Sequence, residues 1–74
     1  MNKLPVVSGK DLVKALSKIG YEVDHQTGSH IILRQADEPH RRLSVPNHKE
    51  LAKGTLRKLL TAVGITSEEL NDIL

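Results

Sequence analysis

A chain of 74 residues has room for one domain with one small hydrophobic core, and its lack of cysteine excludes a disulfide framework and a thiolate metal site. Its net charge of +2 is unevenly distributed: residues 34–58 carry seven bases and three acids, whereas residues 59–74 carry three acids and no base. This local excess of cations favours a polyanionic partner, and a single aromatic residue argues against a protein that binds single strands by stacking bases.

The chain shows no pattern typical of export or of membrane insertion. Residues 1–7 lack the apolar stretch of a secretory signal, and the longest internal apolar run, Ile31–Leu33, is too short to cross a bilayer. We therefore expect a single domain over residues 1–74 that lies in the cytoplasm and makes no membrane contact.

The first expected element is a helix that begins after Ser8. Ser8 and Asp11, three residues apart, are typical of a capping box, and Gly20 is the expected stop. Apolar residues recur between them at helical spacing: Leu12, Ala15, Leu16 and Ile19. The opposite face carries lysines four residues apart: Lys10, Lys14 and Lys18.

Three short strands are expected next. Tyr21 and Val23 alternate with Glu22 and Asp24, which is typical of a half-buried strand. Residues 26–29 form the expected turn, residues 30–34 the second strand, residues 37–39 a break, and residues 42–45 a third strand that ends at Pro46. One face should be apolar, with Tyr21, Val23, Ile31, Leu33, Leu43 and Val45. The other should carry His30, Ile32, Arg34, Arg42 and Ser44.

A second main helix is expected to begin near residues 53–55 and to end at Gly64, with a buried stripe of Leu56, Leu59, Leu60 and Val63. Thr66 and Glu69 resemble another capping box and predict a short final helix. The order predicts an α+β sandwich of two layers, a three-stranded antiparallel sheet with two main helices on one face. It is the order of double-stranded RNA-binding domains.

His30 is the strongest candidate for a catalytic group. It follows Gly28 and Ser29 at the mouth of a hairpin and heads a strand on the solvent face, together with Arg34 and Arg42. RNA cleavage needs a base for the 2′-hydroxyl proton and positive charge near the phosphate, and this face offers both. The same residue types are also consistent with an ordinary surface histidine.

His48 is the second candidate, in the loop Pro46-Asn47-His48 before the second main helix. It would act as a general acid opposite His30 or bind a phosphate; the alternative is a histidine that holds loop backbone. His25 and His40 have no such context and are read as surface residues. The sequence has no metal-ligand spacing and no phosphate-binding glycine loop, so we expect neither a metal nor another cofactor.

Basic residues open the second main helix at Lys53, Arg57 and Lys58. A helix N-terminus presents free N–H groups, so this end suits a phosphate, although a solvated charged face would look the same. The lysines of the first helix are open to the same two interpretations. The full set expected to contact RNA is Lys10, Lys14, Gly28, Ser29, Arg34, Arg42, Lys53, Arg57 and Lys58.

Several stretches resemble the HicA family, also called YcfA-like, from Ser8 to Leu74. They are Gly28-Ser29-His30, the loop from Pro46 through His48 to Leu51, the run from Lys53 to Leu60, and the exit Gly64-Ile65. The resemblance implies a metal-independent mRNA interferase, an endoribonuclease toxin of a type II toxin–antitoxin pair. It implies that His30 is the catalytic residue of the Gly-x-His step, and that a HicB-type antitoxin covers the active face.

Two other functions fit the same pattern. A non-catalytic double-stranded RNA-binding module would use the same fold and basic helix ends without needing a histidine. An interaction domain would use the basic face to meet an acidic protein, and Ile32 on the exposed face would suit such an interface.

Overall fold

Helices and strands follow one another in the expected order. The computed structural model describes residues 4–74, so the first three residues of the N-terminal segment, expected to carry no secretory signal, lie outside the described part. The elements are α1 (Gly9–Ser17), β1 (Tyr21–Thr27), β2 (His30–Gln35), β3 (Arg42–Pro46), α2 (Lys53–Val63) and α3 (Ser67–Ile73).

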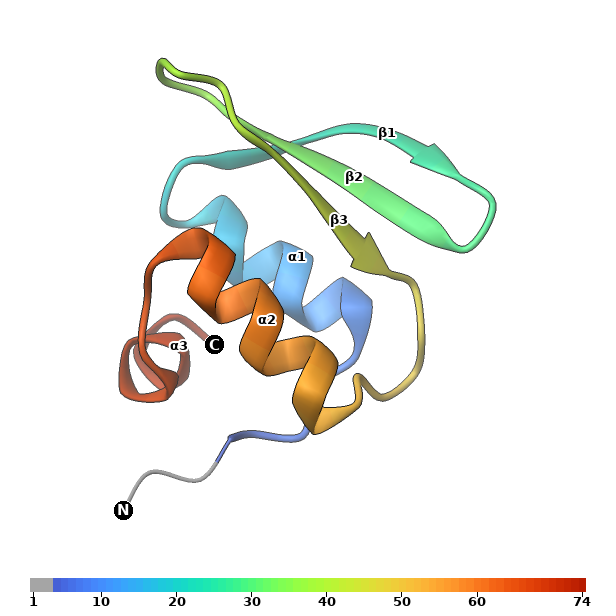
Figure 1. Cartoon of the computed structure of the whole chain (residues 1–74), viewed down its shortest axis with the longest axis vertical. Coiled ribbons are helices and arrows are strands. Elements are labelled where there is room, and N and C mark those ends of the chain that lie inside the picture. Colours follow the sequence, from blue (N-terminus) through green and yellow to red (C-terminus); the bar gives the residue numbers. More distant parts are fainter. Residues whose placement is uncertain (1–3) are drawn as a thin grey trace.

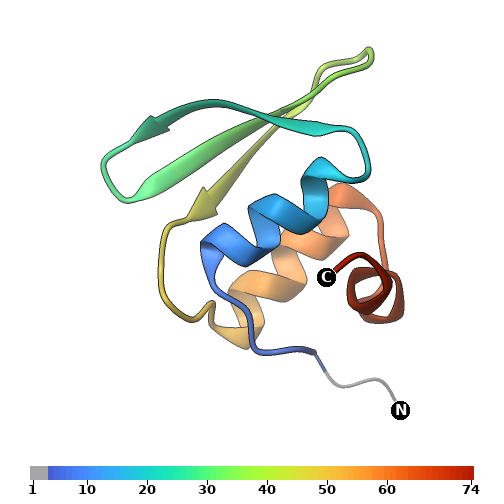
Figure 2. The same cartoon turned by 180° about the vertical axis from the view of Figure 1, so that it is seen from behind.

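The three strands form one antiparallel sheet in the order β1-β2-β3. Figures 1 and 2, which view the molecule from opposite sides, place α1 and α2 on the same side of this sheet, with α3 beside them. The predicted α+β sandwich, with helices on one face only, is therefore confirmed. Within residues 4–74, no helix is long and apolar enough to cross a membrane.

The helix boundaries follow from capping chemistry. Ser8 and Thr66 each accept a hydrogen bond from the backbone N–H three residues on, and each forms the predicted capping box. Gly64 ends α2 in the left-handed conformation, at φ 87°. A stop at Gly20 would make Ile19 the last helical residue, and this expectation is wrong by two residues. The helix ends at Ser17, and Gly20 instead forms the turn into β1 at φ 99°, which leaves Ile19 outside the helix and 40% exposed.

The core lies between the sheet and the helices. Its largest fully buried side chains come from every layer: Leu12, Leu16, Leu33, Val45, Leu56 and Leu70. Tyr21, Ile31 and Leu43 complete the sheet's contribution, and Leu51 adds a buried residue from the loop before α2. Strands β2 and β3 thus alternate between buried and exposed residues, as their sequence predicts.

Val23 lies on the predicted apolar face of the sheet but is not buried there. Val23 pairs with Leu33 and so lies on the helix-facing side, but it is 55% exposed. Strand β1 is an edge strand, and only its first residue, Tyr21, is buried, since the helices cover no more of it. The strand also runs to Thr27, so the turn is Gly28-Ser29 alone, shorter than the expected residues 26–29.

Gly9 fixes the start of α1 against the loop that follows β3. A Cβ at this position would overlap the backbone carbonyl of Pro46. The Gly9 N–H donates to the His48 carbonyl at 2.9 Å, and the Leu51 N–H donates to the Val7 carbonyl at 2.8 Å. The loop of residues 47–52 is therefore tied by its backbone to the first helix.

Candidate functional site

Polar side chains cover the face of the sheet that points away from the helices, called the outer face below. Residues that pair across antiparallel strands project to the same side, so the register defines three rows on this face. The rows are Thr27–His30–Pro46, His25–Ile32–Ser44 and Glu22–Arg34–Arg42. Ile32 and Pro46 are half-buried and the other seven are exposed. The outer face is thus a solvent-facing platform, as the sequence predicts.

His30 begins β2 directly after the two-residue turn. Gly28 takes φ 48°, a conformation that favours glycine, and so allows the tight reversal. The Ser29 carbonyl accepts a hydrogen bond of 2.7 Å from the Asn47 N–H, which ties the turn to the loop after β3. The Ser29 hydroxyl lies 3.4 Å from Nδ1 of His30. This contact falls on Nδ1, so Nε2 is the ring nitrogen on the side away from Ser29.

Arg34 and Arg42 lie directly opposite each other at the other end of the outer face. They are separated from His30 by four residues along the strand, which is roughly 13 Å at the rise of an extended chain. Two like charges side by side are unfavourable, and Glu22, opposite Arg34, offsets part of this repulsion. The two arginines thus put positive charge at the end of the outer face that lies away from His30.

His25 occupies the row between His30 and the arginines, which the sequence did not indicate. Neighbouring side chains of a regular strand point to opposite faces, yet Nδ1 of His25 donates to the Asp24 carboxylate at 2.7 Å. The register explains this contact. Val23 lies opposite Leu33 and His25 opposite Ile32, so Asp24 is an extra residue at a β-bulge. The bulge brings the Asp24 carboxylate beside the His25 ring.

Asp24 is held in its charged form by this arrangement. The hydrogen bond from His25 lowers the pKa of the Asp24 carboxyl below its ordinary value of 3.8, against a partial opposing effect of burial. The positive charges of Arg42 and Arg34 lower this pKa further. Both guanidinium groups therefore act on Asp24, which connects the middle row of the outer face electrostatically to the row of arginines.

His48 lies near the same end of the sheet but in different surroundings. It lines a shallow hollow of about 180 Å³ together with Ser8, Lys10, Asn47 and Lys49. His30 is not part of this lining, and the hollow places His48 beside Lys10 of α1. His40 lies in the loop between β2 and β3, where its Nδ1 is 3.0 Å from the Gln35 carbonyl and its φ is 55°.

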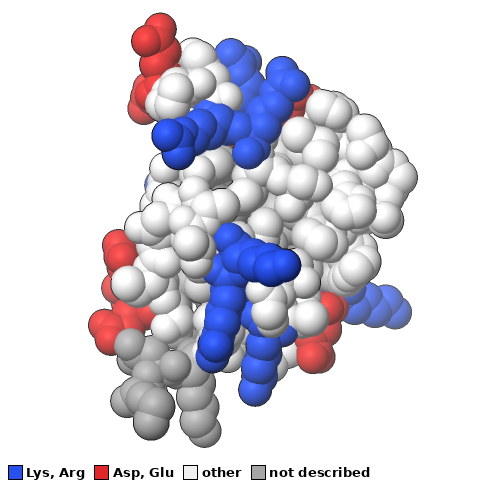
Figure 3. All heavy atoms as spheres, in the orientation of Figure 1, with Lys and Arg blue, Asp and Glu red and all other residues white. Residues whose placement is uncertain are grey.

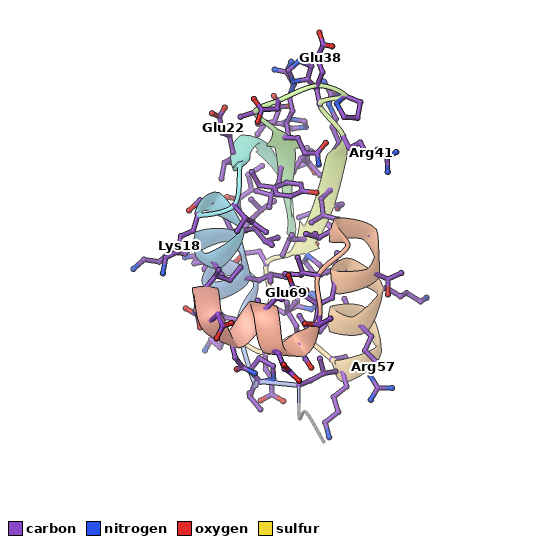
Figure 4. All side chains as sticks on the ribbon, turned by 90° about the vertical axis from the view of Figure 1, so that its left-hand side faces the viewer. Lys18, Glu22, Glu38, Arg41, Arg57 and Glu69 are labelled. Carbon is purple, nitrogen blue, oxygen red and sulfur yellow. The ribbon has the colours of Figure 1, made fainter. Side chains whose placement is uncertain are left out.

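The remaining cations expected to bind RNA belong to the helical layer. Lys53, Arg57 and Lys58 are exposed on α2, and Ala52 at its N-cap supplies no side-chain hydrogen bond. Figure 3 shows one group of cations over α2 and another over the end of the sheet, with largely uncharged surface between them. Lys14 lines a hollow beside α3, and Figure 4 shows Lys18 and Arg57 pointing to opposite sides of the molecule. The cations thus form separate groups.

The described residues also bear on metal binding and on relatives. Across residues 4–74, no three His, Asp or Glu side chains gather as metal ligands. A family model described as HicA toxin of bacterial toxin-antitoxin matches residues 9–65, a span that includes the whole sheet and both main helices. No curated protein gives a match.

Proposed function

The chain belongs to the HicA toxin family of bacterial toxin–antitoxin pairs, and from this premise we propose that it is a metal-independent endoribonuclease that cleaves mRNA with His30. The observation that carries the proposal is the position of His30. It is exposed at the first residue of β2, beside a turn that a glycine makes tight, on a face whose far end carries Arg34 and Arg42.

His30 would act as the general base of an internal transesterification. Its ring removes the proton of the 2′-hydroxyl, and the 2′-oxygen attacks the adjacent phosphorus in line with the leaving 5′-oxygen. The product is a 2′,3′-cyclic phosphate. General base catalysis contributes typically 10²–10⁴-fold, so we expect a slow enzyme.

The arginines would bind the substrate at a distance from the reacting bond. At roughly 13 Å along the strand, Arg34 and Arg42 suit phosphates on one side of the cleaved position. Gly28 and Ser29 would let the RNA backbone approach the turn closely, because neither carries a bulky side chain. The cations of the helical layer, Lys10, Lys14, Lys53, Arg57 and Lys58, would add contacts to longer RNA.

The antitoxin partner would be of the HicB type and would cover the outer face. Ile32, half-buried at the centre of this face, offers an apolar contact among charged residues. An antitoxin on this face would block access of RNA to His30. We place the pair in the cytoplasm, where mRNA is found.

Replacement of His30 by Ala should abolish cleavage and leave the fold intact, because the side chain is exposed and outside the core. The test is growth arrest and mRNA integrity after expression of this chain alone, beside cleavage of RNA by the purified protein. His40→Asn is a matched control, a histidine removed at the other end of the sheet and replaced by a residue that tolerates a positive φ.

Two results would contradict the proposal. Equal cleavage by wild type and His30→Ala would remove His30 from the reaction. RNA that is bound and shifted in a gel but never cut by wild type would favour the non-catalytic RNA-binding module. Circular dichroism of each variant separates loss of activity from loss of fold.

A further inference from the structure

We propose that His25, held by Asp24, is the second acid–base group of this site and protonates the 5′-oxygen as it leaves. The inference rests on the proposed ribonuclease function and assigns a role to a residue that the sequence pattern left as surface. It is carried by geometry: the bulge in β1 puts a carboxylate–histidine pair on the same face as His30, one row away.

The register sets the separation between the two histidines. His25 lies opposite Ile32, and His30 is two residues before Ile32 on the same strand. His25 and His30 are therefore diagonal neighbours on one face, a relation that separates β-carbons by at most about 7–8 Å. Two imidazole rings at this spacing can contact a single phosphodiester from opposite sides, one at the 2′-oxygen and one at the 5′-oxygen. His48 has no such relation to His30, since it lies beyond β3 in the hollow with Lys10.

Asp24 fixes which nitrogen of His25 faces the substrate. Nδ1 donates to the Asp24 carboxylate at 2.7 Å, so in the protonated ring it is the Nε2 proton that is free to be transferred. The His25 side chain is 49% exposed and that of Asp24 is 30% exposed, so the ring is open to a substrate. The titratable and charged groups near this pair are Glu22 on β1, His30 and Arg34 on β2, and Arg42 on β3. Asp24 is the positioning residue of the pair and a counterion for the protonated ring.

The reaction then balances within the site. The 2′-hydroxyl proton moves to neutral His30 as the 2′-oxygen bonds to phosphorus. The bond from phosphorus to the 5′-oxygen breaks, and protonated His25 gives its Nε2 proton to that oxygen. The products are a 2′,3′-cyclic phosphate and a 5′-hydroxyl, with His30 protonated and His25 neutral. Proton exchange with water restores both rings.

A substrate whose leaving group needs no proton tests this role directly. The two probes are a short RNA with one cleavable phosphodiester and the same RNA with sulfur in place of the bridging 5′-oxygen, because a thiolate leaves without a general acid. With the normal RNA, His25→Ala and His25→Gln should each reduce the rate about 10²–10⁴-fold, and Asp24→Asn should reduce it by less. With the sulfur RNA, all three variants should cleave at close to the wild-type rate, whereas His30→Ala should fail on both.

Each other outcome overturns the inference. Equal losses on both RNAs would make His25 a binding or structural residue, and unchanged rates on both would remove it from the reaction. A loss specific to the oxygen substrate in His48→Ala, absent in His25→Ala, would move the acid to His48. Wild-type protein that cuts neither RNA would overturn the proposed function itself, which the first three outcomes leave standing. His40→Asn is again the control, and circular dichroism verifies each fold.

Discussion

The pKa of the Asp24 carboxyl reports on the hydrogen bond and the charges around it on the outer face of the sheet. His25 donates to it, and Arg42 and Arg34 add positive charge nearby, so its pKa in the folded protein is below 3.8. We expect nuclear magnetic resonance titration of the Asp24 side chain to show this lowered value. In His25→Ala the pKa should move back toward 3.8, because the hydrogen bond is the largest cause.

The lowered pKa of Asp24 also predicts how the stability of the fold changes with pH. A carboxyl whose pKa is lower in the folded state than in the unfolded chain stabilises the fold at pH values above its unfolded-state pKa. This contribution is lost as the pH falls through the lowered folded value, and it is small because the pair is exposed to solvent. Arg42→Ala should raise the Asp24 pKa by less than His25→Ala. A pKa that is identical in wild type and His25→Ala would contradict the hydrogen bond.

At the residue scale, the sequence predicted the exposed position of His30 but not the contact between Asp24 and His25. Alternation of polar and apolar residues in β2 predicts that His30 and Arg34 face solvent, and the structure confirms this placement. The same rule separates Asp24 from His25, because adjacent residues of a regular strand lie on opposite faces. The bulge that unites them depends on how β1 pairs with β2, and local sequence carries no signal for that pairing.

At the scale of elements, α1 depends on a glycine, Gly9, that no local sequence pattern marks as special. Gly9 lies under the Pro46 carbonyl, so Gly9→Ala should destabilise the protein by about 1–3 kcal/mol, because the added methyl forces the loop away and strains the hydrogen bond to His48. Thermal or urea unfolding measures the change. Gly54→Ala is the matched control in α2, where a Cβ meets open space. It should be neutral or raise the free energy of unfolding by up to about 1 kcal/mol.

Comparable losses in both variants would show that the effect at Gly9 is not steric.

Sequence predicts those features of the elements that depend on local residues alone. Capping boxes at Ser8 and Thr66 are local, and both were predicted correctly. The role of Gly9 and the exposure of Val23 depend on how elements far apart in the chain pack together, and local patterns do not encode that packing.

At the scale of the whole molecule, the cations lie in separate groups on the sheet and on the helices (Figure 3). If both groups contact RNA, affinity should fall steeply with salt as counterions are released. Replacing Lys53, Arg57 and Lys58 together by Ala should lower the slope of log affinity against log salt by about 2, at roughly 0.7 for each lost contact to a single strand. Filter binding of His30→Ala protein, with and without these substitutions, measures the slope without cleavage.

A slope that stays unchanged in the triple variant would confine RNA to the outer face. Removal of Arg34 and Arg42 supplies the comparison, because these two residues lie on the same face as His30. The sequence predicted a polyanionic partner from the cluster of basic residues in residues 34–58, and not from the small overall charge of +2. In the fold these basic residues are divided between the sheet and the helical layer. Which layer would meet the proposed RNA substrate therefore depends on the three-dimensional arrangement of the cations.

The alternation along β2 separates the residues that stabilise the fold from the residues that the proposed activity needs. Ile31 and Leu33 pack into the core, while His30 and Arg34, one residue away on either side, face solvent. Under the proposed function, selection for a folded protein and selection for a toxic one fall on different positions. A gene copy that loses His30 would then encode a folded, inactive protein that keeps the rest of its outer face. If the antitoxin binds this face as proposed, such a copy would occupy antitoxin as a decoy and raise the dose of antitoxin needed to protect the cell.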